Sequence, residues 1–284
     1  MKLDDAKALD AALTPDSRVL IVGAGLIGLK CAEGIRDKGK SITVVDLADR
    51  VLPSILDEEG SAIMQRHIEK HGIRFFLGNS VARFSSAHTA ELKNGESVEF
   101  DILVTAVGVR ANTQLAAGIG CAVNRGIVTD EHCATNLPGV YAAGDCSESF
   151  DISTGTERVL AILPNAYMQG ETAGICMAGG NKRYDRAIPM NAIGFFGLHI
   201  ITAGSYDGEA WVEKTESSYK KLVSKENFLK GFILIGDVAR AGIYTSLIRE
   251  QTPLDTVDYE LLKQKPQLMA FTSELRAVKL GGAR

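Results

Sequence analysis

Three features are missing from this sequence, and each absence excludes a class of protein. No apolar run is long enough to span a membrane, and the start (MKLDDAKALDAAL) is too charged for a secretory signal. Positive charge is not in excess either, since 31 Lys and Arg stand against 35 Asp and Glu and give a formal net charge of −4. Neither a nucleic acid nor an anionic membrane surface is therefore expected as a partner.

Cysteine, histidine and proline are also sparse. The five cysteines form no C-x-x-C pair and no metal-ligand spacing, and the five histidines are scattered. This predicts reduced, mostly packed thiols in a cytoplasmic protein, and no metal site. Seven prolines beside 29 glycines are typical of an α/β protein with many tight turns. The 284 residues suffice for one large domain or two to three small ones.

The stretch that organises the chain runs from Val19 to Asp46 (VLIVGAGLIGLKCAEGIRDKGKSITVVD). The apolar run 19–22 predicts a strand buried on both faces, and the β-branched run 42–45 predicts a second strand. Between them, residues 23–28 match G-x-G-x-x-G and open a helical pattern that ends near Gly39. With an acid about twenty residues on, this context is typical of a dinucleotide-binding unit.

Each residue of the motif has a physical role. Gly23 permits the tight turn, Gly25 lets a pyrophosphate approach the backbone, and Gly28 lets helix and strand pack closely. The helix N-terminus offers free N–H groups and the positive end of its dipole. Asp46 can accept hydrogen bonds from an adenosine ribose and would repel a 2′-phosphate, so the motif favours NAD(H) over NADP(H). The alternative is a glycine-rich turn with no ligand, and the flanking strand, helix and acid argue against it.

Hydrophobic periodicity predicts the other elements of this region. Residues 2–13 predict a short helix, 56–71 a longer helix that stops at Gly72, and 74–77 a third strand. Together these segments complete the β-α-β-α-β half of a Rossmann fold.

Beyond residue 81 the hydrophobic period changes to two. Asn94-Gly95 between the alternating runs 88–93 and 96–101 predicts a hairpin with a type I′ turn. The apolar run 102–107 predicts another buried strand, after which the chain leaves the first sheet.

Further strands are expected at 126–130 and 140–143. Gly144-Asp145 ends the second of these with a carboxylate at the carboxyl edge, where open α/β sheets bind ligands. Residues 164–179 are helical in pattern, and Gly179-Gly180-Asn181 is the clearest linker.

From about Tyr184 strands outnumber helices, which predicts an antiparallel α+β domain. Residues 219–223 and 232–235 predict strands, and 243–249 predict a short helix. The end of the chain, 275–284, is expected to be mobile.

A second motif carries a resemblance to a known family. Residues 134–145 (ATNLPGVYAAGD) resemble the T-x-x-P-G-[VI]-[YF]-A-A-G-D signature of FAD-dependent pyridine nucleotide-disulfide oxidoreductases. In that family the aspartate, here Asp145, binds the ribityl chain of the flavin. Residues 104–110 look like the return segment between the NAD and FAD domains, and 163–170 resemble the helix start beneath the isoalloxazine ring. Residues 230–237 are similar to a strand of the family's interface domain. Within the family, the chain most resembles the NADH-dependent rubredoxin reductase and nitrite reductase large-subunit branch.

The resemblance implies the cofactors FAD and NADH and a division into domains. An NAD(H)-binding domain at 18–107 would follow a linker helix at 1–17, and a partial FAD-binding domain at 108–183 would precede a C-terminal α+β domain at 184–284. The fold class is thus α/β with a Rossmann-like domain, the second half of an FAD domain and an α+β interface domain. No catalytic side chain is assigned. The candidate cofactor-binding residues are Gly23, Ala24, Gly25, Leu26, Ile27, Gly28, Asp46, Arg50, Gly108, Gly144, Asp145 and Ala166.

The sequence also departs from the family pattern. A full-length member of the family carries an earlier G-x-G-x-x-G that holds the FAD pyrophosphate. This sequence contains only the G-x-G-x-x-G that begins at Gly23. Only the second half of the FAD domain is therefore expected. Lys30 stands where many members have a glutamate near the nicotinamide. For Asn165 and Gln169, a polar helix start explains the residues as well as flavin contact does.

Two functions remain open. The chain is expected to be an NADH-dependent FAD oxidoreductase that passes hydride from NADH to flavin, and electrons onward to a rubredoxin- or ferredoxin-type carrier or another acceptor. Because that chemistry belongs to the cofactor, no side-chain base or nucleophile is needed. The alternative is an NADH-binding module, or a truncated or split subunit, that is inactive without an N-terminal FAD-binding half or a homodimer partner. The acceptor itself has no local sequence signature.

Overall fold

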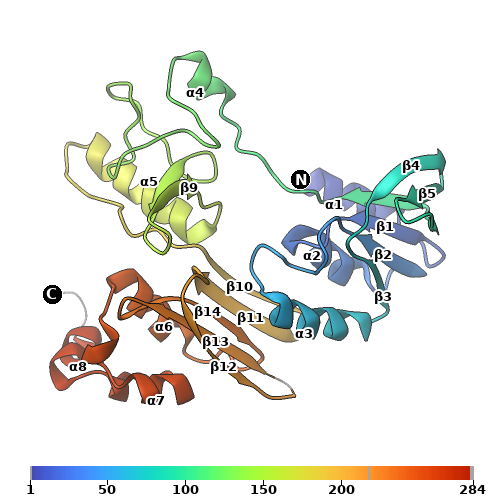
Figure 1. The fold of residues 1–284 in the computed structure, drawn as a ribbon. Helices are drawn as coiled ribbons and strands as arrows, with labels where there is room; N and C mark the ends of the chain where they lie inside the picture. The colour runs from blue at the N-terminus through green and yellow to red at the C-terminus, as the bar shows by residue number, and fades with distance from the viewer. Residues whose placement is uncertain (1, 217, 282–284) are drawn as a thin grey trace. The chain divides into compact units, whose positions relative to one another are not determined.

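The structure is a computed structural model that describes residues 2–216 and 218–281 (Figure 1). It divides into two compact units, Met1–Val109 with Ile193–His199, and Arg110–Ala192 with Ile200–Arg284. We call these unit 1 and unit 2. Among the described residues, no helix has the length and apolar character that crossing a bilayer requires.

Unit 1 contains a four-stranded parallel sheet in the order β3-β2-β1-β7. Its strands are β1 (Arg18–Val22), β2 (Ser41–Val45), β3 (Ile73–Phe76) and β7 (Ile102–Thr105). Its helices are α1 (Leu3–Ala12), α2 (Leu26–Ile35) and α3 (Glu58–Glu69). The predicted β-α-β-α-β unit is therefore confirmed, although α2 ends four residues before Gly39.

Local chemistry explains where α3 begins and ends. The carboxylate of Asp57 accepts the N–H of Gly60 at 2.9 Å and so caps the first turn. Gly72 follows the helix with a φ of +81°, a conformation that glycine adopts without steric cost. The inner side of the helix buries Met64 and Ile68.

An antiparallel meander of β4 (Val81–Ser86), β5 (Thr89–Leu92) and β6 (Ser97–Glu99) follows the first three strands. Its apolar side chains pack in one cluster with Leu20 and Val45 of the parallel sheet. The predicted hairpin is present, but the predicted type I′ turn is wrong, because only Gly95 has a positive φ and Asn94 does not. The N–H of Gly95 donates to the carbonyl of Leu92 at 3.0 Å, so the longer loop ends on a left-handed glycine.

The predicted burial of strand 102–107 is also wrong. The strand ends at Thr105, Leu103 is exposed, and Val107 is 78% exposed. β7 pairs with β1 alone among the described strands, and its alternating burial shows that one of its two faces has no covering element among the described residues.

Two predicted strands of unit 2 do not form. Residues 126–130 and 140–143 take part only in isolated bridges, of which Ala134–Tyr141 is one. A strand needs a neighbouring ladder, and none of the described residues supplies one here. The regular elements of this region are α4 (Gln114–Gly118), β8 (Glu148–Asp151), β9 (Thr156–Val159) and α5 (Leu163–Met177).

The C-terminal region contains a five-stranded sheet in the order β10-β11-β14-β13-β12, which confirms the predicted α+β architecture. Pairing from β11 through β14 and β13 to β12 is antiparallel. The strands are β10 (Met190–Phe195), β11 (Leu198–Gly204), β12 (Glu209–Lys214), β13 (Tyr219–Lys225) and β14 (Phe228–Ile235). The helices are α6 (Ala241–Glu250), α7 (Tyr259–Gln264) and α8 (Ser273–Leu280), with single 3₁₀ turns at Leu254–Thr256 and Leu268–Ala270.

The core of this region joins sheet and helix. Phe232 of β14 and Tyr244 of α6 are fully buried, with ring centroids 5.5 Å apart. Of the segment 275–284 that was expected to be mobile, residues up to Leu280 are helical in α8, and 282–284 lie outside the described residues.

Candidate dinucleotide and flavin sites

The glycine-rich turn of unit 1 connects β1 to α2 under tight steric limits. A Cβ on Gly23, whose φ is +118°, would lie 2.3 Å from the carbonyl oxygen of Ala106. A Cβ on Gly28 would lie 1.9 Å from the carbonyl oxygen of Gly23. A Cβ on Gly25, by contrast, would have no atom within 4 Å. Gly23 and Gly28 therefore serve the packing of strand and helix, whereas Gly25 leaves open space above the helix N-terminus where a pyrophosphate would fit.

Asp46 lies directly after β2, and its carboxylate binds the glycine-rich turn. One oxygen accepts the N–H of Ala24 at 2.5 Å and the other accepts the N–H of Ala48 at 2.7 Å. An ionised carboxylate offers about four acceptor positions. Roughly two positions therefore remain for the hydroxyls of a ribose.

Arg50 supplies an unsatisfied donor in the same loop. Its guanidinium pairs with Asp49 at 2.9 Å, yet its Nε is buried and has no hydrogen-bond partner among the described residues. Buried donors are normally paired, so this atom fits a ligand oxygen. The open space at Gly25, the free positions on Asp46 and this Nε together fit a nicotinamide dinucleotide.

Leu26 and Ile27, two further candidates, line a groove of about 1240 Å³ between α1, α2 and β7. Its walls are mainly apolar, and Lys30 stands at its border. The ammonium of Lys30 pairs with Glu33 and donates to the carbonyl of Gly194 at 3.1 Å, so it already has partners. Burial favours a higher pKa for Glu33, but the hydrogen bonds from Lys30 and from the N–H of Phe196 lower it overall.

In unit 2 the candidate flavin residues meet at the start of α5. Gly144 has a φ of +86°, and its Cβ position would lie 3.7 Å from the Cβ of Ala166. The N–H of Gly144 donates to Gln169 at 2.6 Å, which fixes this turn against the helix. The next residue, Asp145, is exposed and makes no hydrogen bond or ion pair with any described residue. A free carboxylate beside a helix start fits the hydroxyls of a ribityl chain. Gly108 is assigned to unit 1 and is not grouped with these residues.

Asn165 and Gln169 point into unit 2. The hydroxyl of Tyr184 donates to Asn165 at 2.5 Å, and the amide of Gln169 donates to Ser149. Both amides are buried, so they join α5 to its neighbours.

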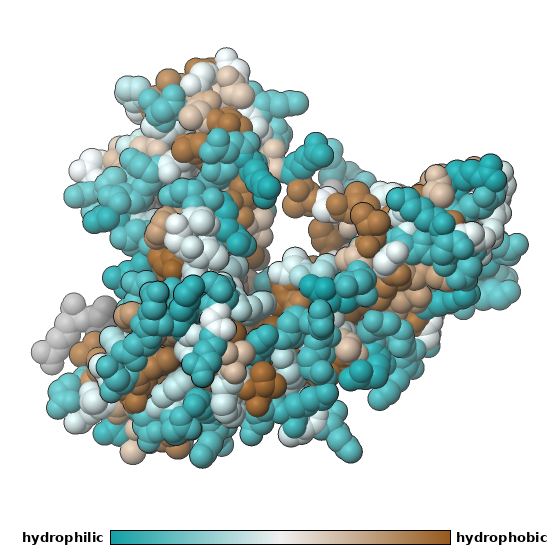
Figure 2. Space-filling model, in the orientation of Figure 1, coloured by the Kyte–Doolittle hydropathy of each residue, from teal (hydrophilic) through white to brown (hydrophobic). Residues whose placement is uncertain are grey.

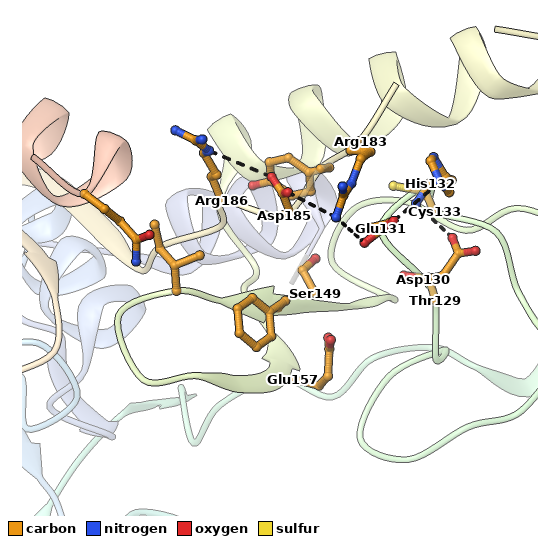
Figure 3. Close-up of a pocket in the computed structure, with 14 residues that line it drawn as sticks. Thr129, Asp130, Glu131, His132, Cys133, Ser149, Glu157, Arg183, Asp185 and Arg186 are labelled. Atoms are coloured by element: carbon orange, nitrogen blue, oxygen red, sulfur yellow. Dashed lines mark hydrogen bonds and ion pairs between the residues drawn. The ribbon is translucent and has the colours of Figure 1, made fainter. Parts of the chain in front are cut away.

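A second pocket, of about 730 Å³, contains none of the candidate residues (Figure 3). Figure 3 shows Arg183 and Arg186 on one side, above Ser149 and Glu157. Arg183 pairs with Glu131 at 2.8 Å and Arg186 with Asp185 at 3.9 Å, so both arginines already have counter-ions. No sequence motif marks this pocket, because its walls come from segments that lie far apart in the chain.

The cysteines play no visible part in either site. All five are free thiols, and burial raises the pKa of Cys133 to about 11. Burial also raises the pKa of the Cys31 thiol on α2. Among the described residues, no group of His, Cys, Asp and Glu could hold a metal ion.

Sequence comparison identifies the family. Residues 1–170 match the family described as pyridine nucleotide-disulphide oxidoreductase. The chain belongs to this family. Residues 189–252 match the C-terminal domain of rubredoxin NAD⁺ reductase, so the resemblance seen in the sequence motifs is confirmed.

Individual relatives are longer than this chain. It is 30% identical to the NADH-dependent phenylglyoxylate dehydrogenase subunit epsilon of Aromatoleum evansii, over 89% of this chain and 62% of that protein. It is 28% identical to the nitrite reductase [NAD(P)H] of Bacillus subtilis (strain 168), over 89% of this chain and 32% of that protein. A solved putidaredoxin reductase–putidaredoxin complex matches with a TM-score of 0.84 and 22% identity, over 95% of this chain and 66% of that chain. The last match shows a shared fold.

Proposed function

We propose that this chain is an NADH-dependent FAD oxidoreductase that receives hydride from NADH and passes electrons to a redox carrier or another acceptor. The observation that carries the proposal is the glycine-rich turn of unit 1, where Gly25 leaves open space beside Asp46 and the Nε of Arg50, which has no partner among the described residues. When bound, FAD supplies the hydride acceptance and the one-electron steps, so the protein needs only to bind and orient the two cofactors.

The candidate residues divide this work. In unit 1, the N-terminus of α2 would hold the pyrophosphate and Asp46 the adenosine ribose of NADH. In unit 2, Asp145 and the start of α5 would hold the ribityl chain. We propose the domain limits 18–107, 108–183 and 184–284 for the NAD(H), partial FAD and C-terminal domains.

A carrier protein of rubredoxin or ferredoxin type is the proposed acceptor. Support comes from residues 189–252, which match a rubredoxin reductase domain, and from the solved relative that was captured with putidaredoxin. The five free cysteines support the predicted cytoplasmic location.

Anaerobic spectroscopy tests the function. The purified chain, incubated with FAD and freed of excess cofactor, should retain the visible flavin band and lose it on addition of NADH. A flavin-loaded protein whose band does not respond to NADH would refute the proposal.

A second candidate function is an NADH-binding subunit that becomes active only with a partner. One observation favours it: the described residues provide the Asp145 side of a flavin site and only one glycine-rich phosphate turn, the one in unit 1. A colourless protein that binds NADH would support this candidate over the first.

A further inference from the structure

The pocket of about 730 Å³ in unit 2 has the size of a small-molecule site and no part in the proposed function. Its walls come from residues within 129–133, 149–157 and 183–186 and from Gln251. Apolar side chains reach the surface of both units (Figure 2), but this pocket also presents directed polar groups, which indicate what it could bind. We call it the hairpin pocket, because residues 149–157 belong to the hairpin of β8 and β9.

One wall of the hairpin pocket presents hydrogen-bond donors that its ion pairs do not use. A guanidinium carries five N–H groups. Arg183 contacts Glu131 at 2.8 Å and Asp185 at 3.6 Å through Nη2 alone, so Nε and Nη1 engage no described residue. Arg186 forms an ion pair with Asp185 at 3.9 Å but makes no hydrogen bond with any described residue. These donors suit the oxygens of a carboxylate.

The other wall presents a carboxylate beside an aromatic ring. Phe150 and Glu157 are directly opposite each other in the antiparallel pair of β8 and β9, so their side chains lie on the same face of the hairpin. Phe150 is 40% exposed, and the carboxylate of Glu157 makes no hydrogen bond or ion pair with any described residue. Figure 3 shows Glu157 and Arg183 on opposite sides of Ser149. A carboxylate next to an aromatic face suits an ammonium group.

Ser149 contributes a buried hydroxyl between these walls. Its side chain lines the pocket, although the residue is only 6% exposed. The hydroxyl oxygen accepts the amide of Gln169, but the hydroxyl proton has no acceptor in the described part of the chain. Since buried donors are normally paired, this proton fits a ligand oxygen on the side of the arginines.

The backbone of the pocket is strained at two positions. Cys133 has a φ of +60° and Gln251 a φ of +50°, in the left-handed region that residues other than glycine rarely adopt. Seven described non-glycine residues have such a φ, and these two of them line the hairpin pocket. Strained residues gather at ligand-binding sites, so the strain supports a binding role for the pocket.

The charge balance of the lining limits the class of ligand. Four acidic residues and two arginines line the pocket: Asp130, Glu131, Glu157, Asp185, Arg183 and Arg186. A simple anion would be repelled by the acidic majority, whereas a simple cation would leave the arginine donors and the proton of Ser149 without partners. A small molecule that carries both charges satisfies both walls.

We infer that the hairpin pocket binds a free α-amino acid with an apolar side chain. Its carboxylate accepts hydrogen bonds from the two arginines and from the hydroxyl of Ser149. Its ammonium lies between the carboxylate of Glu157 and the ring of Phe150. The apolar side chain covers the exposed part of that ring. Binding of the amino acid does not depend on the proposed function.

Titration calorimetry on the full chain, without added flavin or nucleotide, tests the binding. The probes are L-leucine and L-phenylalanine, which share both charged groups and differ only in the apolar side chain. At least one of them should bind one-to-one with a Kd of about 1 mM or tighter. If neither gives a saturable signal at about ten times that concentration, the inference is overturned.

Analogues of the probe that binds more tightly test whether both charges are recognised. Its carboxamide lacks the anionic group, and its N-acetyl derivative lacks the ammonium. Each should bind at least about 10-fold more weakly than the amino acid. A carboxamide that binds equally well would show a site for cations, and an N-acetyl derivative that binds equally well would show a site for anions. Either result would overturn the inference.

Two conservative variants assign each charge to its wall. Glu157→Gln should weaken the amino acid by about 10-fold and remove its advantage over the N-acetyl derivative. Arg186→Gln should weaken the amino acid and reduce its advantage over the carboxamide. Both side chains are exposed and make no hydrogen bond with a described residue, so both variants should fold.

The matched control is Glu209→Gln on β12, which changes an exposed carboxylate outside the pocket. It should bind the amino acid as tightly as the unchanged chain does. If Glu157→Gln and Glu209→Gln have equal effects, the amino acid does not bind at the hairpin pocket and the inference is wrong.

Discussion

Replacing Asp46 by alanine removes the carboxylate that joins the end of β2 to the glycine-rich turn. The N–H groups of Ala24 and Ala48 lose acceptors at 2.5 and 2.7 Å, and the proposed ribose contact is lost with them. A hydrogen bond to a charged group contributes about 1.5–3 kcal/mol, so NADH should bind about 10- to 100-fold more weakly. NADPH should bind no more weakly than before, because the charge that repels its 2′-phosphate is gone. The ratio of the two affinities is therefore the quantity to measure.

Titration calorimetry with both nucleotides measures this ratio. Asp46→Asn is the matched control, since it keeps the size and one carbonyl oxygen but loses the charge. It should preserve part of the NADH affinity while also losing the discrimination against NADPH. If Asp46→Ala leaves the affinity ratio unchanged while the protein stays folded, Asp46 does not contact the ribose and the reasoning is refuted.

Three further predictions concern the glycine-rich turn, the exposed carboxylate of Asp145 and the buried thiol of Cys133. Gly28→Ala places a Cβ 1.9 Å from the carbonyl oxygen of Gly23 and should lower the free energy of unfolding by about 1–3 kcal/mol. Gly25→Ala, by contrast, should fold normally and bind NADH more weakly. If denaturation and NADH titration give the same results for both variants, the two glycines do not have these separate roles. Asp145→Ala should change stability by less than about 0.5 kcal/mol, because the carboxylate has no partner among the described residues, but should weaken FAD retention. Burial raises the pKa of Cys133 to about 11, so the thiol ionises at a lower pH in the unfolded chain than in the folded one. The free energy of unfolding should therefore fall as the pH rises from about 9 towards 11. Denaturant unfolding of Cys133→Ala should lack that part of the pH dependence.

The first half of the fold could be predicted because its signals are local. An apolar run, a glycine-rich turn and a helical period specify β1 and α2, and short connections join the parallel strands. The turn type at Asn94-Gly95 failed because that dipeptide also fits the longer loop that ends on a left-handed glycine.

Elements that depend on distant partners were predicted less well. Residues 126–130 and 140–143 have the composition of strands, but a strand forms only where a neighbour pairs with it. The burial of 102–107 failed for a related reason, since composition does not reveal that one face of β7 lacks a covering element among the described residues.

In the candidate sites, too, local features could be predicted from the sequence, whereas contacts between distant residues could not. The motif pointed to Asp46, yet it could not show that both oxygens of this carboxylate bind backbone N–H groups. Nor could it show that the Nε of Arg50 is buried with no partner in the described part of the chain. Likewise, the inward orientation of Asn165 and Gln169 depends on Tyr184 and Ser149, which no local pattern connects to α5.

The most direct test of the central claim is the anaerobic visible spectrum of the purified, FAD-treated chain before and after addition of NADH. An NADH-dependent FAD oxidoreductase should show a flavin band that NADH bleaches. A retained flavin band that NADH leaves unchanged would contradict the account.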